Sequence, residues 1–387
     1  MKDVALLGFL AALAVASVLT PPFARLARRA GAVDRVSDRG LAREATPLLG
    51  GLAILVAVLV ASLLFLPLTQ GTKAILGGAT LVCLVGAYDD WRELPPSAKL
   101  AGQLAAALLL VLNGVTVDAV TLPFVQRVEF GELGDVLTLL GLVAIMNVVN
   151  FSDGVDGLAA GVCAISAVAF AIIAFDLGKQ TAGVLAAITA GGALGFLVHN
   201  FHPASVFMGD AGSNLLGLLL GGAIVEGSLK TNALIALVVP LVVLAVPFLD
   251  TGFVVAKRIK YGRPVYRADS NHFHHRFHRI GFSQRRTVLY LYAWTVTMAA
   301  LAVALRFIPY TTDGGTFRLG WSLVMGALLL AALAASVYLV LVLEILKLRR
   351  LRTWQLRGAD PATSEHEIDA EVERELETGE FRALDPR

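Results

Sequence analysis

The chain has 387 residues, of which 57% are hydrophobic and only 16% are charged, and its mean hydropathy is +0.73. Soluble domains carry about 25% charged residues, so this composition excludes an ordinary soluble protein and indicates an integral membrane protein. The formal net charge of +2 is uninformative by itself, and no segment resembles a nucleic-acid-binding domain. Cys83 and Cys163 lie inside apolar runs, where we expect buried thiols and neither a disulfide nor a metal knuckle.

The first apolar run, near residues 4–20, has the length of a secretory signal but not its charge order. A signal peptide carries its basic residues before the apolar stretch. Here Arg25, Arg28 and Arg29 follow the stretch, whereas only Lys2 beside Asp3 precedes it. We therefore expect a retained first membrane span.

A helix needs about 20 apolar residues to cross a hydrocarbon core. Runs of this kind predict eleven transmembrane helices, near residues 4–22, 48–67, 73–88, 99–116, 135–149, 157–176, 181–198, 213–229, 232–256, 287–308 and 319–346. The runs at 73–88 and 135–149 are short, so we expect both helices to extend into their polar flanks. The predicted fold class is an all-α integral membrane protein.

The basic residues predict the orientation, because Lys and Arg concentrate in cytoplasmic loops. Three segments are rich in them: 23–47, 257–286 and 347–352. Eleven spans place all three on the same side of the membrane. We therefore expect the N-terminus outside and the C-terminus in the cytoplasm.

Two segments outside the spans have patterns of their own. In the outer loop 117–134, β-branched residues surround a Pro and a Gly, which indicates a small hairpin. From residue 353 onward the chain is acidic, and we favour a solvated, disordered tail over a short helix that starts at Ser364. We divide the chain into a polytopic membrane domain, 1–352, and this tail, 353–387.

Four polar stretches interrupt the apolar sequence, at residues 86–94, 147–161, 199–217 and 270–279. An even number of predicted spans separates each stretch from the next. All four should therefore lie on the cytoplasmic face, at helix ends. The sequence thus predicts that their acids, amides and histidines gather at one end of the helix bundle.

Asp89 and Asp90 form a carboxylate pair at the end of a predicted span. A plain polar helix end is one interpretation. Neighbouring like charges repel, however, and raise the pKa of one group unless a cation lies between them. A divalent ion or a proton-transfer role is the better interpretation.

Two further turns carry oxygen ligands. "NVVNFSDGVDG" (147–157) places Asn147, Asn150, Asp153 and Asp156 before a helix, and "FMGDAGS" (207–213) places Asp210 between glycines at a helix start. Carboxylate and amide oxygens are the ligands that Mg²⁺ prefers, together with substrate phosphates. Backbone N–H groups at a helix start can also receive a phosphate.

The loop "SNHFHHRFHR" (270–279) concentrates histidines and arginines. Its His272, His274 and His275 could hold zinc, but no cysteine and no HExxH helix accompanies them. A solvated basic loop and a phosphate clamp are the other interpretations, and we favour the clamp because it would face the acids.

Three more polar residues at span ends have modest interpretations. His199 and His202 flank Asn200, and we expect them only to cap a helix or to reach the interface. Asp250 lies within a span, where an unpaired acid is costly, so we expect it to pair with Lys257 or Arg258.

Taken together, these motifs resemble the polyprenyl-phosphate N-acetylhexosamine-1-phosphate transferases of glycosyltransferase family 4, which initiate cell-envelope polysaccharide synthesis. The resemblance runs in order through "TPLLGG" (46–51), "DDWREL" (89–94), the two turns above, "PFLDT" (247–251) and "HFHHRFHRIGFSQRRTV" (272–288). The His-x-His-His spacing is similar to the branch that uses UDP-N-acetylglucosamine. The branch that uses UDP-N-acetylmuramoyl-pentapeptide typically has three consecutive histidines.

The resemblance implies that N-acetylhexosamine-1-phosphate passes from a UDP-sugar to undecaprenyl phosphate, or a related polyprenyl phosphate, with release of UMP. It implies Mg²⁺, or Mn²⁺ in its place, and a homodimer is a form known in the family. Roles are implied for ten residues. The metal ligands would be Asn150 and Asp210; the catalytic residues Asp89, Asp90 and Asp153; and the substrate-binding residues Asp156, His272, His274, His275 and Arg276.

One motif departs from the family pattern. The family has a Lys-x-His after an Arg before "TPLLGG", whereas Arg39 is followed by Gly40, Leu41 and Ala42 here. Three alternatives therefore stay open: UDP-N-acetylmuramoyl-pentapeptide as the donor, a binding relative without turnover, and a transporter or flippase of an anionic substrate. Transporters usually show internal repeats and charges near the membrane midplane, and the sequence shows neither.

Overall fold

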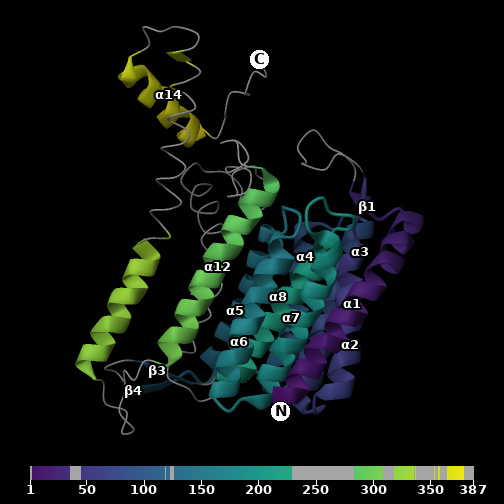
Figure 1. Cartoon of the computed structure of the whole chain (residues 1–387). Helices are drawn as coiled ribbons and strands as arrows, with labels where there is room; N and C mark the ends of the chain where they lie inside the picture. Colours follow the sequence, from purple (N-terminus) through teal and green to yellow (C-terminus); the bar gives the residue numbers. More distant parts are fainter. Residues whose placement is uncertain are drawn as a thin grey trace. The chain divides into compact units, whose positions relative to one another are not determined.

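A computed structural model describes residues 2–34, 45–117, 119–122, 126–228, 283–307, 318–334, 336, 353, 356–357 and 364–378 (Figure 1). The chain divides into two compact units. The first comprises Met1–Tyr266 and Val288–Phe307, and the second comprises Arg267–Thr287 and Ile308–Arg387. Each unit is described by itself below.

Helices dominate the described residues. They are α1 (Lys2–Ala30), α2 (Gly50–Phe65), α3 (Gln70–Trp91), α4 (Pro96–Val111), α5 (Glu132–Ser152), α6 (Leu158–Asp176), α7 (Gln180–Asn200), α8 (Gly209–Ser228), α12 (Gln284–Phe307), a helix at Leu319–Ala334, and α14 (Glu365–Thr378). Ten of the eleven predicted spans coincide with a helix, and the ninth, 232–256, lies outside the described residues. The short runs at 73–88 and 135–149 do extend, as α3 and α5.

Six helices of the described residues are long and apolar enough to cross a membrane: α1, α3, α5, α6, α7 and Gln284–Ala304 of α12. Three shorter apolar helices accompany them, namely α2, α4 and Leu319–Ala334. The prediction of a multi-pass, all-α membrane protein is therefore confirmed in its class. The total of eleven spans and the orientation of the termini stay predictions.

Short strands form two antiparallel pairs. β3 (Ala119–Leu122) pairs with β4 (Gln126–Glu129), which is the hairpin that the sequence predicts within 117–134. β1 (Val33–Asp34) pairs with β2 (Thr46–Pro47) and brings the end of α1 beside the start of α2.

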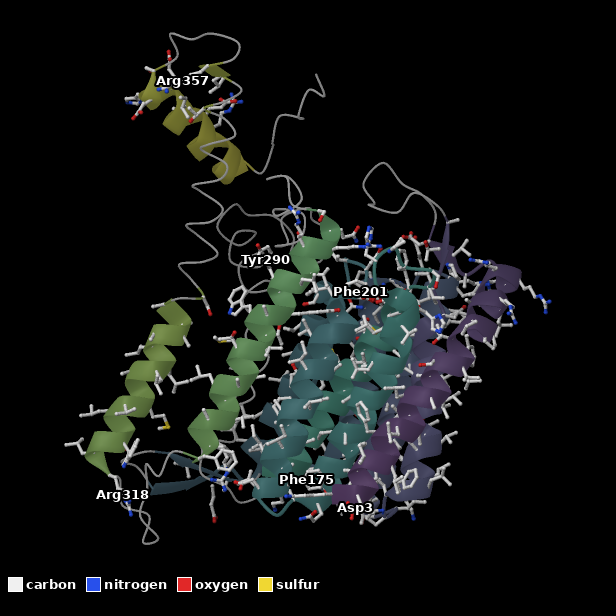
Figure 2. All side chains as sticks on the ribbon, in the orientation of Figure 1. Asp3, Phe175, Phe201, Tyr290, Arg318 and Arg357 are labelled. Carbon is white, nitrogen blue, oxygen red and sulfur yellow. The ribbon has the colours of Figure 1, made fainter. Side chains whose placement is uncertain are left out.

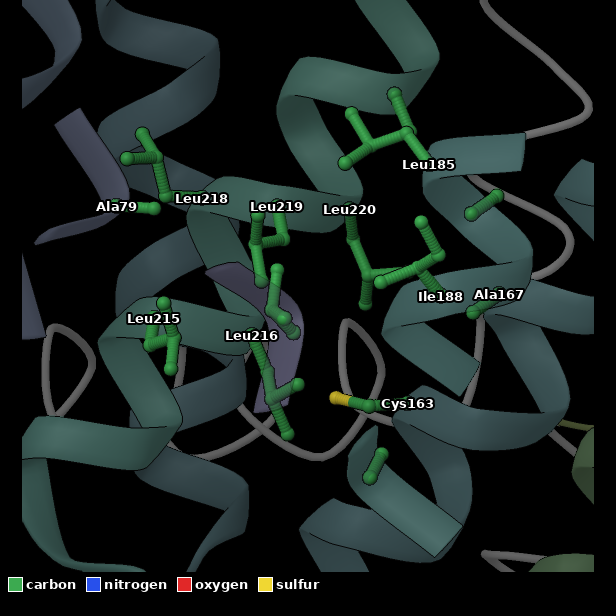
Figure 3. Close-up of a cluster of buried hydrophobic side chains, with 14 of the residues drawn as sticks. Ala79, Cys163, Ala167, Leu185, Ile188, Leu215, Leu216, Leu218, Leu219 and Leu220 are labelled. Atoms are coloured by element: carbon green, nitrogen blue, oxygen red, sulfur yellow. The ribbon is translucent and has the colours of Figure 1, made fainter. Parts of the chain in front are cut away.

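The leucine-rich helix α8 lies in the core of the first unit. Its side chains Leu215, Leu216, Leu218, Leu219 and Leu220 are fully buried, and Figure 3 shows them among side chains of the neighbouring helices. A helix that is apolar all round is buried on every face. Cys83 and Cys163 are also buried and free, as the sequence predicts. The core therefore fixes the position of α8, and with it the polar residues at the start of this helix.

The motif "TPLLGG" pairs with the segment that precedes α8. Phe207 donates its N–H to the carbonyl of Pro47 at 2.8 Å, and the N–H groups of Gly50 and Gly51 donate to Phe207 and Met208 at 3.1 Å each. Gly51 also lies against the backbone of Gly212, where a Cβ would collide with main-chain atoms. The motif therefore holds the N-terminal end of α8 against that of α2.

The ends of the helices show which loops share a face. The indole of Trp91, at the end of α3, donates to the carbonyl of Ala30, at the end of α1, at 3.0 Å. The first residues of α1 lie at the other end of the bundle, where Figure 2 labels Asp3 and Phe175, whereas Phe201 is near the end that carries the polar turns. The predicted gathering of polar stretches at one end is confirmed for residues 86–94, 147–161 and 199–217.

In the second unit, the acidic tail contains α14. Ser364 and Glu367 cap its N-terminus reciprocally: the Ser364 N–H donates to Glu367 Oε2 at 2.9 Å, and the Glu367 N–H donates to Ser364 Oγ at 3.3 Å. This is a capping box. Of the two alternatives that the sequence leaves open for the tail, the structure has the helix over Glu365–Thr378.

Candidate active site

Three carboxylates meet at the polar end of the bundle. Asp89 and Asp90 lie in the last turn of α3, and Asp210 lies in the first turn of α8. One oxygen atom of each lies within 4.8 Å of the others, and Asp89 is only 8% exposed. Like charges this close repel unless cations lie among them. The cluster is therefore a candidate site for a cation.

Lys99 supplies one positive charge to this cluster. Its ammonium nitrogen lies 2.6 Å from Asp89 Oδ2 and 3.1 Å from Asp210 Oδ2. α3 ends at Trp91, and Pro95 and Pro96 start α4 as its N-cap and first residue. Lys99, in the first turn of α4, thereby meets the end of α3. Three carboxylates against one ammonium leave an excess of negative charge, which suits a divalent cation.

The sequence prediction did not assign Lys99. Its position could have marked it as a candidate site residue, because this lysine begins the apolar predicted span 99–116. A single base at a span end ordinarily reaches toward the membrane surface. Only the packing of α4 against α3 and α8 shows that Lys99 turns inward to the acids.

Asn150, in the last turn of α5, completes the cluster. Its Nδ2 donates to Asp210 Oδ1 and to Ser213 Oγ, at 2.9 Å each. The amide nitrogen thereby fixes one oxygen of Asp210. Carboxylate and amide oxygens are hard ligands that fit Mg²⁺ or Mn²⁺ better than a soft metal.

Asp90 holds the start of α8. Its Oδ1 accepts the backbone N–H of Asp210 at 2.8 Å, and its Oδ2 accepts that of Ala211 at 3.1 Å. Gly209 precedes them at φ 69°, and a Cβ there would collide with the Asp90 carboxylate. Asp90 therefore acts as a helix cap contributed by another helix, and it sets the position of Asp210.

Asp153 lies in the turn between α5 and α6, outside both helices. Burial, and then the negative charges of Asp210, Asp90 and Asp156, hold the pKa of Asp153 well above its usual range. This turn therefore contributes a carboxyl group that resists ionisation while no cation is near.

Asp156 belongs to a neighbouring group of contacts. Its Oδ2 lies 2.7 Å from His202 Nδ1 and accepts the Ala204 N–H at 3.1 Å. Asn200 ties the same two loops together, because its Oδ1 accepts the Gly157 N–H at 3.0 Å and its Nδ2 donates to the Val206 carbonyl at 2.9 Å. Hydrogen bonds thus join the loop before α6 to the loop before α8.

His202 has a larger part than the sequence interpretation gave it. The sequence placed His199 and His202 at a span end and expected only capping or interfacial contacts. His199 does bond a neighbouring backbone carbonyl, that of Ser17, at 2.9 Å. His202 instead pairs with Asp156, a residue of the predicted site, through a contact that spacing along the chain does not reveal.

The structure brings together four residues of the predicted site, Asp89, Asp90, Asn150 and Asp210, and its charge interactions place Asp153 near them. Asp156 lies beside these residues, in the two loops that hydrogen bonds join before α6 and α8. The predicted substrate-binding residues His272, His274, His275 and Arg276 lie outside the described residues, as do Asp250 and Arg39. Their roles, and the zinc and clamp interpretations of the histidine loop, stay predictions.

Known proteins have sequences similar to that of this chain. The family model "Glycosyl transferase family 4" matches residues 72–228, which span the whole cluster. The chain is 36% identical over 302 residues to a probable undecaprenyl-phosphate N-acetylglucosaminyl 1-phosphate transferase of Bacillus subtilis, covering 77% of this chain and 84% of that protein. It is 33% identical over 372 residues to a decaprenyl-phosphate N-acetylglucosaminephosphotransferase of Mycobacterium tuberculosis, covering 88% of this chain and 90% of that protein.

Another group of relatives has a different name. The chain is 35% identical over 310 residues to a phospho-N-acetylmuramoyl-pentapeptide-transferase of Moorella thermoacetica, covering 74% of this chain and 93% of that protein. These matches extend over most of each protein, and the range matched by the family model includes the cluster of acids that the structure assembles. The chain therefore belongs to glycosyl transferase family 4, together with these membrane phosphotransferases.

Proposed function

We propose that this protein transfers N-acetylglucosamine-1-phosphate from UDP-N-acetylglucosamine to a polyprenyl phosphate such as undecaprenyl phosphate. The products would be polyprenyl-diphosphate-N-acetylglucosamine and UMP. The observation that carries the proposal is the cluster of Asp89, Asp90, Asp210, Asn150 and Lys99 at one end of an apolar helix bundle. Such a site can bind a water-soluble diphosphate beside a lipid-borne phosphate.

The reaction brings two anions together. An oxygen of the acceptor phosphate attacks the β-phosphorus of the donor, and the bond from that phosphorus to the bridging oxygen breaks. The bridging oxygen and its electron pair leave with UMP. Phosphoryl transfer of this kind depends chiefly on alignment and on neutralisation of charge.

The charge balance of the cluster supports a divalent cation. Asp210 and Asn150 would hold Mg²⁺, with Asp89 and Asp90 beside them. Oxygens of the three carboxylates lie together and carry more negative charge than Lys99 balances, and the Asn150 amide lies against Asp210. When bound, Mg²⁺ would neutralise the donor diphosphate and stabilise UMP as the leaving group. Mn²⁺ could take the same ligands.

The protein's own residues would supply the remaining functions. Lys99 would shift from the acids toward a phosphate oxygen when the cation occupies the cluster, because its ammonium group is partly exposed. Asp89 would position the acceptor phosphate and accept its proton. Asp156, oriented by His202 and by the Ala204 N–H, would bind the uracil of the donor.

The site would face the cytoplasm of a bacterial cell, on the plasma membrane. This assignment follows from the basic residues that flank the polar end of the bundle, such as Arg25, Arg28 and Arg29 at the end of α1. The same side would hold the histidine loop, whose His272, His274 and His275 would grip the diphosphate. Synthesis there would initiate an envelope polysaccharide.

A donor panel tests the proposal. The full-length protein, purified in detergent, would be given undecaprenyl phosphate with UDP-N-acetylglucosamine, UDP-N-acetylgalactosamine or UDP-N-acetylmuramoyl-pentapeptide, with Mg²⁺ or with EDTA. We expect Mg²⁺-dependent UMP release and a radiolabelled lipid product with UDP-N-acetylglucosamine. Product only with the pentapeptide donor would transfer the assignment to that branch.

Transport is tested with the same purified protein after its reconstitution into lipid vesicles. Reconstituted vesicles that accumulate a labelled UDP-sugar or lipid-linked sugar, while no UMP forms, would favour the transporter alternative. Tight UDP-sugar binding without turnover would favour a binding relative. The names of the relatives favour the transferase, because each of them is called a transferase or phosphotransferase.

A further inference from the structure

A second polar layer lies one helical turn deeper in the bundle than the charged cluster, which is the group of Asp89, Asp90, Asp210, Asn150 and Lys99. It consists of three carboxamide side chains, Gln103 on α4, Asn147 on α5 and Asn214 on α8. Gln103 and Asn214 are only 5% and 6% exposed. Buried amides in an apolar bundle are costly unless their donors and acceptors are paired.

Hydrogen bonds join these amides across three helices. Gln103 Nε2 donates to Asn214 Oδ1 at 2.7 Å, and Asn147 Nδ2 donates to Gln103 Oε1 at 2.8 Å. Two of the side chains are also tied to backbone carbonyls, because Asn214 Nδ2 donates to Asp210 O and Asn147 Nδ2 to Val143 O, at 2.8 Å each. We call these three residues the amide layer.

Each member of the amide layer stands one turn from a member of the charged cluster. Gln103 follows Lys99 by four residues, Asn214 follows Asp210 by four, and Asn147 precedes Asn150 by three. Residues at these spacings lie on the same face of a helix. A hydrogen bond between two amides therefore fixes the same helix faces that carry the charged groups.

The two layers differ in what they can enforce. Attraction between charges acts over a distance and changes when a cation or a phosphate enters the cluster. Amide hydrogen bonds are short and directional, and they do not depend on the charges above them. Sliding or rotating α4, α5 or α8 would leave a buried amide unpaired, so the amide layer resists such movements.

We propose that Gln103, Asn147 and Asn214 are positioning residues, which set the rotation and depth of their helices and thereby hold Lys99, Asn150 and Asp210 in register. The amide layer does not touch the substrates. Its effect on turnover rests on the proposed function, whereas its effect on the geometry of the cluster does not.

A double-mutant cycle, measured by thermal stability, tests whether the amide layer sets the geometry of the charged cluster, and it needs no turnover. Thermal unfolding in detergent and EDTA would be measured for wild type, Lys99→Met, Asn214→Leu and the double variant. If the amide layer positions the Lys99 ion pairs, these pairs are already misplaced in Asn214→Leu. We therefore expect the drop in melting temperature caused by Lys99→Met to be, in the Asn214→Leu background, at most about half of the drop in wild type. Additive effects would overturn the proposal. Should Asn214→Leu not be recovered folded, Gln103→Met takes its place in the cycle.

A kinetic comparison tests the consequence for the reaction. In the variant that enters the cycle, we expect kcat to fall by about tenfold or more while KM for UDP-N-acetylglucosamine stays within about twofold, because alignment is lost and the donor-binding loops are kept. Thr189→Val is the matched control, since Thr189 is equally buried and bonds only within its own helix, to the Leu185 carbonyl. We expect it to leave both constants unchanged.

The outcomes separate the two proposals. A wild-type kcat in a folded amide-layer variant would overturn the positioning role, whatever its melting temperature. An inactive wild-type enzyme would overturn the proposed function, and the double-mutant cycle would still decide the amide layer.

Discussion

At the scale of single residues, the candidate site is a problem of charge balance. Lys99 pairs with two of the three carboxylates, Asp89 and Asp210. Neutral groups hold all three: Asp89 Oδ1 accepts the Leu94 N–H at 2.7 Å, Asp90 caps α8, and Asp210 accepts from Asn150. These contacts hold the acids together despite their repulsion. The repulsion that remains favours binding of a cation, and the bound cation would in turn be aligned for the donor diphosphate.

Asp210 gives the most direct test of the proposed cation. We expect Asp210→Asn to lower Mg²⁺-dependent UMP release by about 100-fold or more, because the variant loses a charged ligand while the side chain keeps its size. UMP release is measured across a Mg²⁺ titration. Asp135→Asn is the control, since Asp135 is an exposed acid at the opposite end of the bundle, near the start of α5. Full turnover of Asp210→Asn would contradict the assignment of the metal.

The raised pKa of Asp153 should make the stability of the protein depend on pH. The pKa of Asp153 is raised in the folded protein, so in metal-free enzyme wild type loses stability as the pH rises from about 4 toward that raised pKa. The amide side chain of the Asp153→Asn variant does not titrate. We therefore expect the melting temperature of Asp153→Asn, relative to wild type, to increase with pH over this window and then level off. The measurement is thermal unfolding in EDTA at a series of pH values, and a difference that is constant with pH would contradict it.

At the scale of elements, the N-terminal end of α8 decides where the acids meet. Its core leucines fix the helix, "TPLLGG" bonds to the two residues before it, and Asp90 of α3 caps its first N–H groups. Two other parts of the chain, together with the core of α8 itself, therefore fix this one helix start. A small displacement at any of them would move Asp210 relative to Lys99.

The contact between α2 and α8 can be tested at a glycine. Gly51→Ala would place a methyl group against the Gly212 backbone, so we expect it to destabilise the protein by about 1–3 kcal/mol and to reduce turnover as Asp210 shifts. Gly141→Ala on α5 is the matched control, because a Cβ there meets no atom within 4 Å. That substitution should be neutral or stabilise by up to about 1 kcal/mol. Thermal unfolding and UMP release measure both variants, and equal behaviour of the two would contradict the close packing.

At the scale of the whole molecule, the orientation in the membrane can be read from thiol labelling. Cys83 and Cys163 are buried, and they are the two cysteines of the sequence, so an introduced cysteine reports its own position. We expect Asp3→Cys to react with an impermeant maleimide in intact spheroplasts. Arg29→Cys, at the other end of α1, should react only after permeabilisation. The reverse pattern would place the candidate site on the outer face.

The membrane class, the course of the spans and the gathering of acids at one end follow from the sequence. The thickness of the hydrocarbon core fixes how many residues a helix needs to cross it, and the chain must then return through the membrane. Polar stretches separated by an even number of spans therefore share a face, which is how 86–94, 147–161 and 199–217 were placed together. The motifs in these stretches also indicated the family.

The partners of Lys99, His202 and Asp90 were decided only by the tertiary structure. Hydropathy indicates how deep a residue lies along the membrane normal, but it does not indicate which helices are neighbours, because the apolar part of a helix such as α8 can pack against any other apolar helix. The inward turn of Lys99, the pairing of Asp156 with His202 and the cap that Asp90 places on α8 all depend on lateral packing. The sequence by itself determined that Asp89, Asp90, Asn150 and Asp210 gather at one end of the bundle. The packing of the helices decided that Lys99 and His202 join them and which of these residues touch.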